Sequence, residues 1–314
     1  MKESSTINID IQSDVYTDIK EVFDVREQKV QALFNRIFHI PGKAIRPKFM
    51  ALVASFAGGS WDSVRRAAVI IEVVHVASLL HDDVIDGSEL RRGAETVNSL
   101  YSDKVSVLTG DYIVMKAIQM AFDHEDPEVL PVVLKSVNRM VNGEIHDSLN
   151  IGIIDEETYL NTVADKTASL FAASGELAMI LSGASDEERM MGREVGECIG
   201  LAFQIVDDAL DYHGEEVVMG KPENMDARTG RMTLPLIHSL RKYDSDEIHK
   251  LLQNDGAELE QLLAVVSNNG GIDYALKRAR EYVERAREIV LKFSSTDAQQ
   301  DLDAFLTSLI ERRS

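Results

Sequence analysis

The sequence has 314 residues, of which 45% are hydrophobic and 27% charged, a composition typical of a protein with a large core. The formal net charge of -20 argues against nucleic acid or an anionic membrane surface as a general partner, because both select basic faces. The single cysteine, Cys198, excludes an internal disulfide, and no apolar run is long enough to cross a bilayer. We therefore expect a cytoplasmic protein with no stable membrane insertion.

Most of the chain is predicted to be helical. Apolar residues recur at helical spacing in five long segments, and no segment shows the sustained alternation of a β sheet. These segments are residues 64–90, 105–122, 129–149, 157–181 and 187–212. Breaks separate them at 56–59, 124–127, 152–156 and 182–185. The pattern predicts one all-α domain over residues 1–314, a large helical bundle around a central active-site cavity.

Two aspartate clusters of the same form stand at the ends of predicted helices. The first consists of Asp82, Asp83 and Asp86, and the second of Asp207, Asp208 and Asp211. The first and fifth residues of each cluster share a helix face, where like charges repel by roughly a few tenths of a kcal/mol. Local folding gives no reason to repeat this arrangement. Binding of a hard cation explains the repeated clusters, because Mg²⁺ binds carboxylate oxygens together with substrate phosphate oxygens.

Basic residues accompany the clusters. Arg91 and Arg92 follow the first, and Lys221 and Arg231 follow the second. Near the start of the chain, Lys43 and Arg46 lie three residues apart. Carboxylates that bind metal, together with arginine and lysine, are the groups needed to hold a diphosphate. No Walker loop or Rossmann fingerprint is present, so nucleotide binding has no support.

With these motifs the sequence resembles the trans-polyprenyl diphosphate synthases over most of its length. Besides the two clusters, the resemblance rests on Gly42-Lys43…Arg46-Pro47, Arg91-Arg92-Gly93, Gly110-Asp111-Tyr112, Gly143-Glu144, Lys166-Thr167-Ala168, Gly220-Lys221-Pro222 and Thr233-Leu234-Pro235-Leu236. It implies a homodimeric enzyme that condenses isopentenyl diphosphate with an allylic diphosphate, using about three Mg²⁺ ions. The allylic carbon–oxygen bond ionises, the cation alkylates the double bond of isopentenyl diphosphate, and a proton is lost.

The resemblance also assigns roles to individual residues. Asp82, Asp86 and Asp207 would be direct Mg²⁺ ligands, with Asp83, Asp208 and Asp211 as further or outer partners. The allylic diphosphate would contact Arg91, Lys166 and Lys221, and isopentenyl diphosphate would contact Lys43, Arg46, His75 and Arg92. Thr167 and Gln204 would present oxygen dipoles to the cation. The released diphosphate would take the proton.

The sequence departs from the family pattern in several places. The Gly-Lys…Arg-Pro motif near the start of the chain usually begins with two glycines, and here Pro41 replaces the first of them. Ala44 stands where a second basic residue is common. Asp147 occupies a place that often holds glutamine. Arg231 replaces a lysine, so a phosphate contact there would keep the charge but change its geometry.

Each residue taken alone also has a plainer interpretation. One aspartate cluster by itself is more often a solvated helix end than a metal site. His75 lies on an apolar helix and fits a hydrogen-bonded core histidine, and Gln204 fits a core amide. Thr167 could bond to its own backbone. Lys166, within an apolar helix, is costly to bury without a partner and therefore favours a functional role.

The residues before the first cluster bear on product length. Ala77 or Ser78, then Val74, then Ile71 would face a tunnel for the growing chain. Short-chain family members block this tunnel with an aromatic residue, whereas Ala77 and Ser78 are small. We therefore predict a long-chain product like that of heptaprenyl or octaprenyl synthases, made from a farnesyl or geranylgeranyl primer. The tunnel floor could instead be set by the dimer partner or by Met115, Ile118 and Gln119.

Four alternatives remain open. A geranylgeranyl diphosphate synthase has the same chemistry and a shorter product. A class I terpene cyclase shares the first cluster, but its second metal motif differs from the segment at 207–211. A non-catalytic subunit of a heteromeric synthase tends to lose one cluster, and this chain keeps both. A purely structural helical protein has no reason to keep two repulsive clusters.

Overall fold

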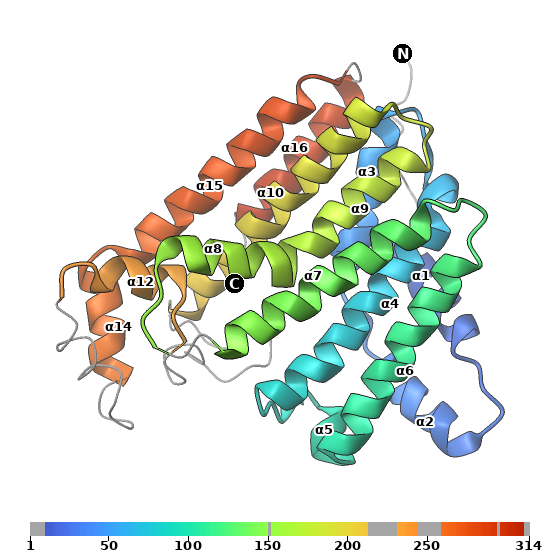
Figure 1. The fold of residues 1–314 in the computed structure, drawn as a ribbon, viewed down its shortest axis with the longest axis horizontal. Coiled ribbons are helices and arrows are strands. Elements are labelled where there is room, and N and C mark those ends of the chain that lie inside the picture. The colour runs from blue at the N-terminus through green and yellow to red at the C-terminus, as the bar shows by residue number, and fades with distance from the viewer. Residues whose placement is uncertain (1–9, 150–151, 213–230, 244–258, 294–295, 311–314) are drawn as a thin grey trace.

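The computed structural model describes residues 10–149, 152–212, 231–243, 259–293 and 296–310. Helices dominate this part of the chain, as predicted, and the long ones run side by side (Figure 1). In chain order they are α1 (Ile11–Val22), α2 (Gln28–Ile37), α3 (Ile45–Phe56), α4 (Trp61–Ile85), α5 (Val97–Leu100), α6 (Asp103–Phe122), α7 (Val129–Leu149), α8 (Glu156–Val163), η1 (Ala164–Ala168), α9 (Ser169–Ile180), α10 (Asp186–Asp211), α12 (Leu234–Leu240), α14 (Leu259–Asn268), α15 (Gly271–Val290) and α16 (Thr296–Ile310).

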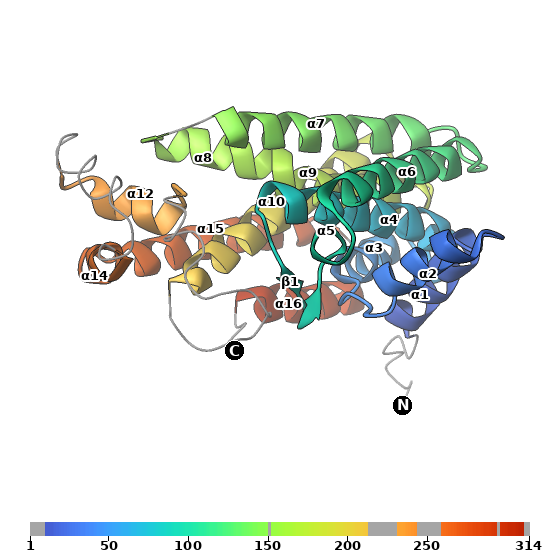
Figure 2. The ribbon, with the colours of Figure 1, turned by 90° about the horizontal axis from the view of Figure 1, so that it is seen from below.

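Helix α9 lies at the centre of the bundle. Every residue of α9 except Glu176 is buried, and the helix contacts α3, α4, α7 and α10. Seen from below, α6 and α7 lie along one side of it and α16 along the other (Figure 2). A helix that is apolar around its whole circumference is stable only when other helices surround it, which explains this central position.

Helices α9 and α10 approach each other closely through glycine. A Cβ atom added to Gly175 would lie 2.0 Å from the carbonyl oxygen of Gly192. Such a distance is far inside van der Waals contact, so a larger residue would push the helices apart. Because α10 carries the second aspartate cluster, this contact fixes the cluster relative to the bundle core.

The predicted helical segments are confirmed with one correction at the end of the first. The prediction of helix up to residue 90 is wrong, because α4 ends at Ile85. Gly87 takes the left-handed conformation with φ of 61°, and the amide of Ser88 donates to the carbonyl of Asp83 at 2.9 Å. The Gly87 amide donates to the carbonyl of Val84 at 3.2 Å, which completes a Schellman cap. The first cluster therefore occupies the last turn of its helix.

A short hairpin follows this cap. Strand β1 (Leu90–Arg91) pairs antiparallel with β2 (Ala94–Glu95) through a two-residue turn. Both turn residues have positive φ, 52° for Arg92 and 73° for Gly93, as a type I′ turn requires. The hairpin was not predicted from the sequence, and it carries both arginines that follow the first cluster.

Candidate active site

Both aspartate clusters lie in the last turn of a long helix. The first ends α4 and the second ends α10. The carboxyl end of a helix carries a partial negative charge, so acidic side chains there are destabilising by roughly 0.3–1 kcal/mol each. The two helix ends therefore add to the repulsion within each cluster. Cations placed against these helix ends would offset this cost.

In the first cluster, Asp82 and Asp83 lie in different environments. Burial, together with the nearby charges of Glu144 and Asp86, raises the pKa of Asp82 to about 6, despite the opposing effects of Lys166 and Arg91. The side chain of Asp83 is buried and accepts a hydrogen bond from Nε of Arg91 at 2.7 Å. Asp86, one turn after Asp82, is exposed. Asp82 and Asp86 thus remain open to a ligand, while Asp83 holds the hairpin against the helix.

In the second cluster, Asp208 is the buried member. It accepts hydrogen bonds from the hydroxyl of Tyr159 at 2.5 Å and from the amide of Gln204 at 2.7 Å. Burial raises the pKa of Asp208, although both hydrogen bonds oppose the rise. Thr167 donates its hydroxyl proton to Gln204 Oε1 at 2.9 Å, which extends this network to η1. Asp207 and Asp211 are partly exposed.

Lys166 lies close to the first cluster, where Asp82 acts on its charge. It projects from the π-helical turn η1, and its ammonium contacts Glu144 at 2.6 Å and Asp147 at 3.2 Å, both on α7. Burial and Arg231 lower its pKa, but Asp82 and Glu144 raise it more, so Lys166 stays charged. Asp147 also forms an ion pair with Arg231. These two cations are placed to bind an anion that the aspartates alone would repel.

A second cationic group forms around Arg46 at the start of α3. Burial lowers the pKa of Arg46 to about 10, against the effects of Glu72 and Asp207. Its guanidinium stacks 4.5 Å from the ring centre of Phe171 on α9. Its Nε atom is buried and has no hydrogen-bond partner among the described residues. A buried guanidinium nitrogen without an acceptor is costly, and an incoming anion would satisfy it.

The chain before α3 is fixed by a hydrogen-bond relay. The hydroxyl of Tyr16 donates to the buried carboxylate of Glu72 at 2.9 Å and accepts from the amide of Gly42 at 2.7 Å. A Cβ at Gly42 would lie 2.8 Å from Nη2 of Arg92, so the hairpin and the loop before α3 lie side by side. Lys43, next along this loop, is exposed. Three predicted cations, Lys43, Arg46 and Arg92, are thus brought to one region.

His75 faces the same region from α4. Burial, together with Arg46, Arg92 and Arg91, lowers its pKa well below the usual value. The imidazole is therefore neutral near pH 7 and offers a hydrogen bond rather than a charge. Lys221, which was predicted to contact the allylic diphosphate, lies outside the described residues.

The predicted tunnel residues differ in their exposure. Ala77, Val74 and Ile71 are completely or almost completely buried, with 0%, 2% and 0% of their surface accessible. Ser78 is partly exposed, and its hydroxyl donates to the carbonyl of His75 at 2.9 Å. Of these four residues, Ser78 is therefore the only one whose side chain is accessible at the surface. On α6, Met115 and Gln119 are exposed and Ile118 is partly exposed.

The donor set fits magnesium bound together with a substrate. Among the residues that the structure describes, no three His, Cys, Asp or Glu side chains converge on one metal position. Mg²⁺ is commonly held by one or two carboxylates plus substrate phosphates rather than by a complete protein cage. The accessible carboxylates of Asp82 and Asp86, together with the partly exposed Asp207 and Asp211, match that requirement.

Sequence reasoning missed several residues that shape this site. Tyr159, Tyr16 and Glu72 carry no motif, and they reach their partners across 49 and 56 positions of the chain. Only Glu72 gave a signal, as a single acidic residue within the apolar segment of α4.

Comparison with known proteins assigns this arrangement to a family. The Polyprenyl synthetase family model matches residues 27–268. The chain belongs to the polyprenyl synthetase family. The octaprenyl diphosphate synthase of Haemophilus influenzae is 31% identical over 280 residues, which cover 86% of this chain and 84% of that protein. The geranylfarnesyl diphosphate synthase of Aeropyrum pernix is 35% identical over 94% of this chain and 98% of its own.

A solved structure gives the same result. The polyprenyl synthase of Caulobacter crescentus, complexed with calcium and isoprenyl diphosphate, matches with a TM-score of 0.90 and 27% identity, over 97% of this chain and 95% of its own. As a polyprenyl synthetase family member, the protein has the isoprenoid synthase helical fold and is an enzyme of the prenyltransferase class. None of its described helices is long and apolar enough to cross a membrane.

Proposed function

We propose that the protein is a Mg²⁺-dependent trans-polyprenyl diphosphate synthase in the cytoplasm. It condenses isopentenyl diphosphate with an allylic diphosphate, farnesyl or geranylgeranyl diphosphate being the primer, and gives a long all-trans product. The observation that carries the proposal is the pair of aspartate clusters at the ends of α4 and α10, with Lys166 near Asp82 of the first and Arg231 near Asp208 of the second. Carboxylates that bind metal ions, with cations close by that bind phosphate oxygens, are the groups needed to hold a diphosphate.

By family resemblance, about three Mg²⁺ ions would be bound. Their ligands would be Asp82, Asp86 and Asp207, with Asp83 and Asp211 as further ligands. When bound, magnesium neutralises charge on the leaving diphosphate. Asp83 is already engaged by Arg91, so its main role would be to hold the hairpin and the helix end in place around the metal ligands. Asp208 holds Gln204 in the same way from the second cluster.

The protein's own side chains position the two substrates. Lys166, Arg91, Lys221 and Arg231 bind the allylic diphosphate, and Lys43, Arg46, Arg92 and neutral His75 bind isopentenyl diphosphate. As the allylic carbon–oxygen bond breaks, its electron pair leaves with the diphosphate. Thr167 and Gln204 present oxygen atoms to the allylic cation, which forms a carbon–carbon bond with isopentenyl diphosphate. The departed diphosphate accepts the proton that restores the double bond, so no protein base is needed.

Product length is set by the residues that meet the growing chain on α4. The small, partly exposed side chain of Ser78 supports an open path, with Ala77, Val74 and Ile71 behind it. Ser78→Phe should shorten the product by one or more isoprene units without abolishing elongation. An unchanged product ladder would place the limit elsewhere, at Met115, Ile118 and Gln119 or in the partner subunit.

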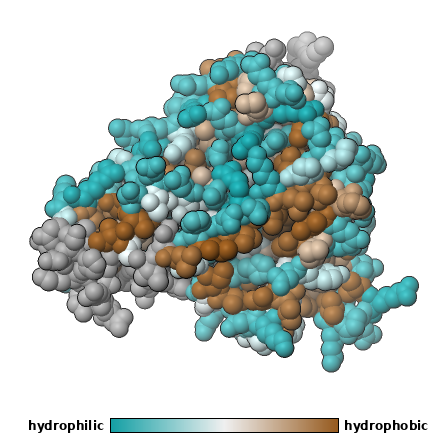
Figure 3. All heavy atoms as spheres, in the orientation of Figure 1, coloured by the Kyte–Doolittle hydropathy of each residue, from teal (hydrophilic) through white to brown (hydrophobic). Residues whose placement is uncertain are grey.

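A second copy of the chain is the partner that the surface supports. Apolar side chains gather along α6 and α7 on the face shown in Figure 3. They recur at helical spacing, with Leu108, Tyr112, Met115 and Phe122 on α6 and Val141, Ile145 and Leu149 on α7, each between 49% and 74% exposed. Two such stripes form a continuous patch of the kind that marks an interface. We place the homodimer contact there.

The decisive experiment is turnover of labelled isopentenyl diphosphate with farnesyl diphosphate, with and without Mg²⁺, followed by chain-length analysis. A Mg²⁺-dependent ladder extending beyond geranylgeranyl is expected. A product that stops at geranylgeranyl would keep the enzyme class and refute the long-chain prediction. Turnover that requires a second, different chain would identify a subunit of a heteromeric synthase.

A further inference from the structure

The π-helical turn η1 carries two of the proposed site residues. It lies between α8 and α9 and contains Ala164, Asp165, Lys166, Thr167 and Ala168. A π turn holds one residue more than an α-helical turn and is rare, and it is frequently found at functional sites. From this turn, the neighbouring side chains of Lys166 and Thr167 reach toward α7 and toward α10.

Arg139 on α7 holds this turn from outside the site. It donates from Nε to Asp165 Oδ1 at 2.7 Å and from Nη2 to the carbonyl of Ala164 at 3.2 Å. The same Nη2 donates to Glu197 on α10 at 3.1 Å. One guanidinium therefore contacts a side chain of the π turn, its backbone, and the helix that carries the second aspartate cluster. A lysine has no planar fork and could not reproduce this set of contacts.

The packing around the turn leaves it little freedom. A Cβ at Gly143, one helical turn after Arg139 on α7, would lie 2.6 Å from the amide nitrogen of Lys166. On the other side, a Cβ at Gly200 of α10 would lie 2.4 Å from Cα of Ala168. The turn is thus held between two glycine backbones, and Arg139 fixes its rotation within that space. The side chain of Arg139 is 24% exposed, so its ion pairs are partly shielded from solvent.

We propose that Arg139 is a positioning residue that holds the π turn in place and thereby sets where Lys166 and Thr167 meet the allylic diphosphate. This inference rests on the proposed roles of Lys166 and Thr167. The hydrogen bonds of Arg139 to Asp165 and Glu197 raise its pKa despite burial, so it stays charged at any working pH.

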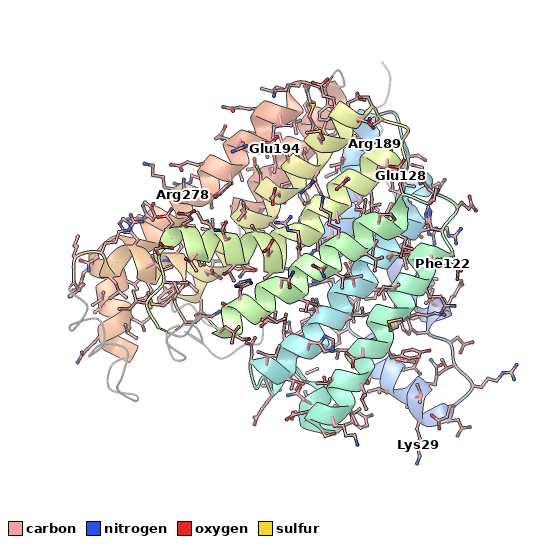
Figure 4. The ribbon with its side chains drawn as sticks, viewed as in Figure 1. Lys29, Phe122, Glu128, Arg189, Glu194 and Arg278 are labelled. Atoms are coloured by element: carbon pink, nitrogen blue, oxygen red, sulfur yellow. The ribbon has the colours of Figure 1, made fainter. Side chains whose placement is uncertain are left out.

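The test compares Arg139→Gln with a matched control. Arg189 lies on α10, is 27% exposed, and also binds a carbonyl, that of Ala184, and a carboxylate, that of Glu128 (Figure 4). Arg189→Gln removes a similar set of contacts at a distance from η1. Each variant is assayed for kcat, for KM of farnesyl and isopentenyl diphosphate, and for Tm.

We expect Arg139→Gln to lower kcat by about 10- to 100-fold, since a displacement near 1 Å at a reacting centre has that effect. The KM for farnesyl diphosphate should rise, and the KM for isopentenyl diphosphate should stay within twofold, because its proposed ligands lie on other elements. Arg139→Lys should fall between wild type and Arg139→Gln. Asp165→Asn, which keeps an oxygen acceptor for Arg139, should retain most activity, and Arg189→Gln should lower Tm without lowering kcat.

Equal kcat for Arg139→Gln and Arg189→Gln below their Tm would overturn the inference. So would a rise in both KM values with kcat unchanged. Lys166→Ala separates this failure from failure of the proposed function. If Lys166→Ala reduces turnover while Arg139→Gln does not, only the positioning role is wrong. If wild type elongates no allylic diphosphate, the proposed function itself fails.

Discussion

Asp82 should destabilise the metal-free protein at neutral pH. Its pKa rises from 3.8 to about 6 on folding, chiefly because the carboxylate leaves water. The folded state therefore binds a proton more tightly than the unfolded state. As pH rises from about 4 to about 6, the folded protein loses stability, and above pH 6 the full cost of about 3 kcal/mol is present.

Asp82→Asn removes this cost and keeps the shape of the side chain. In EDTA, urea denaturation should give a gain of about 3 kcal/mol in the free energy of unfolding at pH 7 and about 1.5 kcal/mol at pH 5. Lys166 is not left unpaired, since Glu144 and Asp147 still contact it. The same substitution should abolish Mg²⁺-dependent turnover, so function and stability oppose each other at this position.

Asp86→Asn is the matched control. Asp86 is one turn further along and exposed, so its substitution should stabilise the protein by no more than about 1 kcal/mol, well below the effect of Asp82→Asn. The reasoning is refuted if Asp82→Asn gives no stabilisation at pH 7, or if the gain is the same at both pH values. A gain of equal size in Asp86→Asn would show that general charge repulsion, rather than burial of Asp82, is responsible.

Three further predictions address other parts of the molecule. Tyr159→Phe removes a hydrogen bond to buried Asp208 and should lower the free energy of unfolding at pH 7 by about 1.5–3 kcal/mol in urea denaturation; no loss would mean that this hydrogen bond contributes nothing. Burial raises the pKa of the Cys198 thiol to about 11, so iodoacetamide at pH 8 should label native protein about a hundredfold more slowly than urea-unfolded protein; equal rates would contradict its burial. Met115→Glu should shift sedimentation from dimer to monomer, whereas Met190→Glu, 71% exposed on α10, should not; a dimer in both variants would place the interface elsewhere.

The sequence predicted the parts of the fold that follow from helical periodicity. The two clusters, their position at helix ends and the boundaries of most long helices all depend on apolar spacing and nearby glycines, which are local signals. The end of α4 was placed too late because Gly87 was not taken as a cap, although a glycine after a polar helix end is a common stop signal.

The parts that were not predicted depend on contacts between distant segments. Nothing in Ala164–Ala168 signals a π turn, because the turn is held by Arg139 and by glycines of α7 and α10. The burial of Asp83 and Asp208 could be predicted, because each lies on the apolar face of its helix. The residues that form hydrogen bonds with them could not be predicted from the sequence. Tyr159 reaches Asp208 only because α8 and α10 pack together.

The most direct test of the proposed site is a crystal structure of the protein with Mg²⁺ and a thio-diphosphate analogue of farnesyl diphosphate that cannot ionise. We predict metal ions that bridge the diphosphate to Asp82 and Asp86 on one side and to Asp207 on the other, with Lys166 in contact with a phosphate oxygen. A diphosphate bound away from both helix ends, or metal on only one aspartate cluster, would contradict the proposed mechanism.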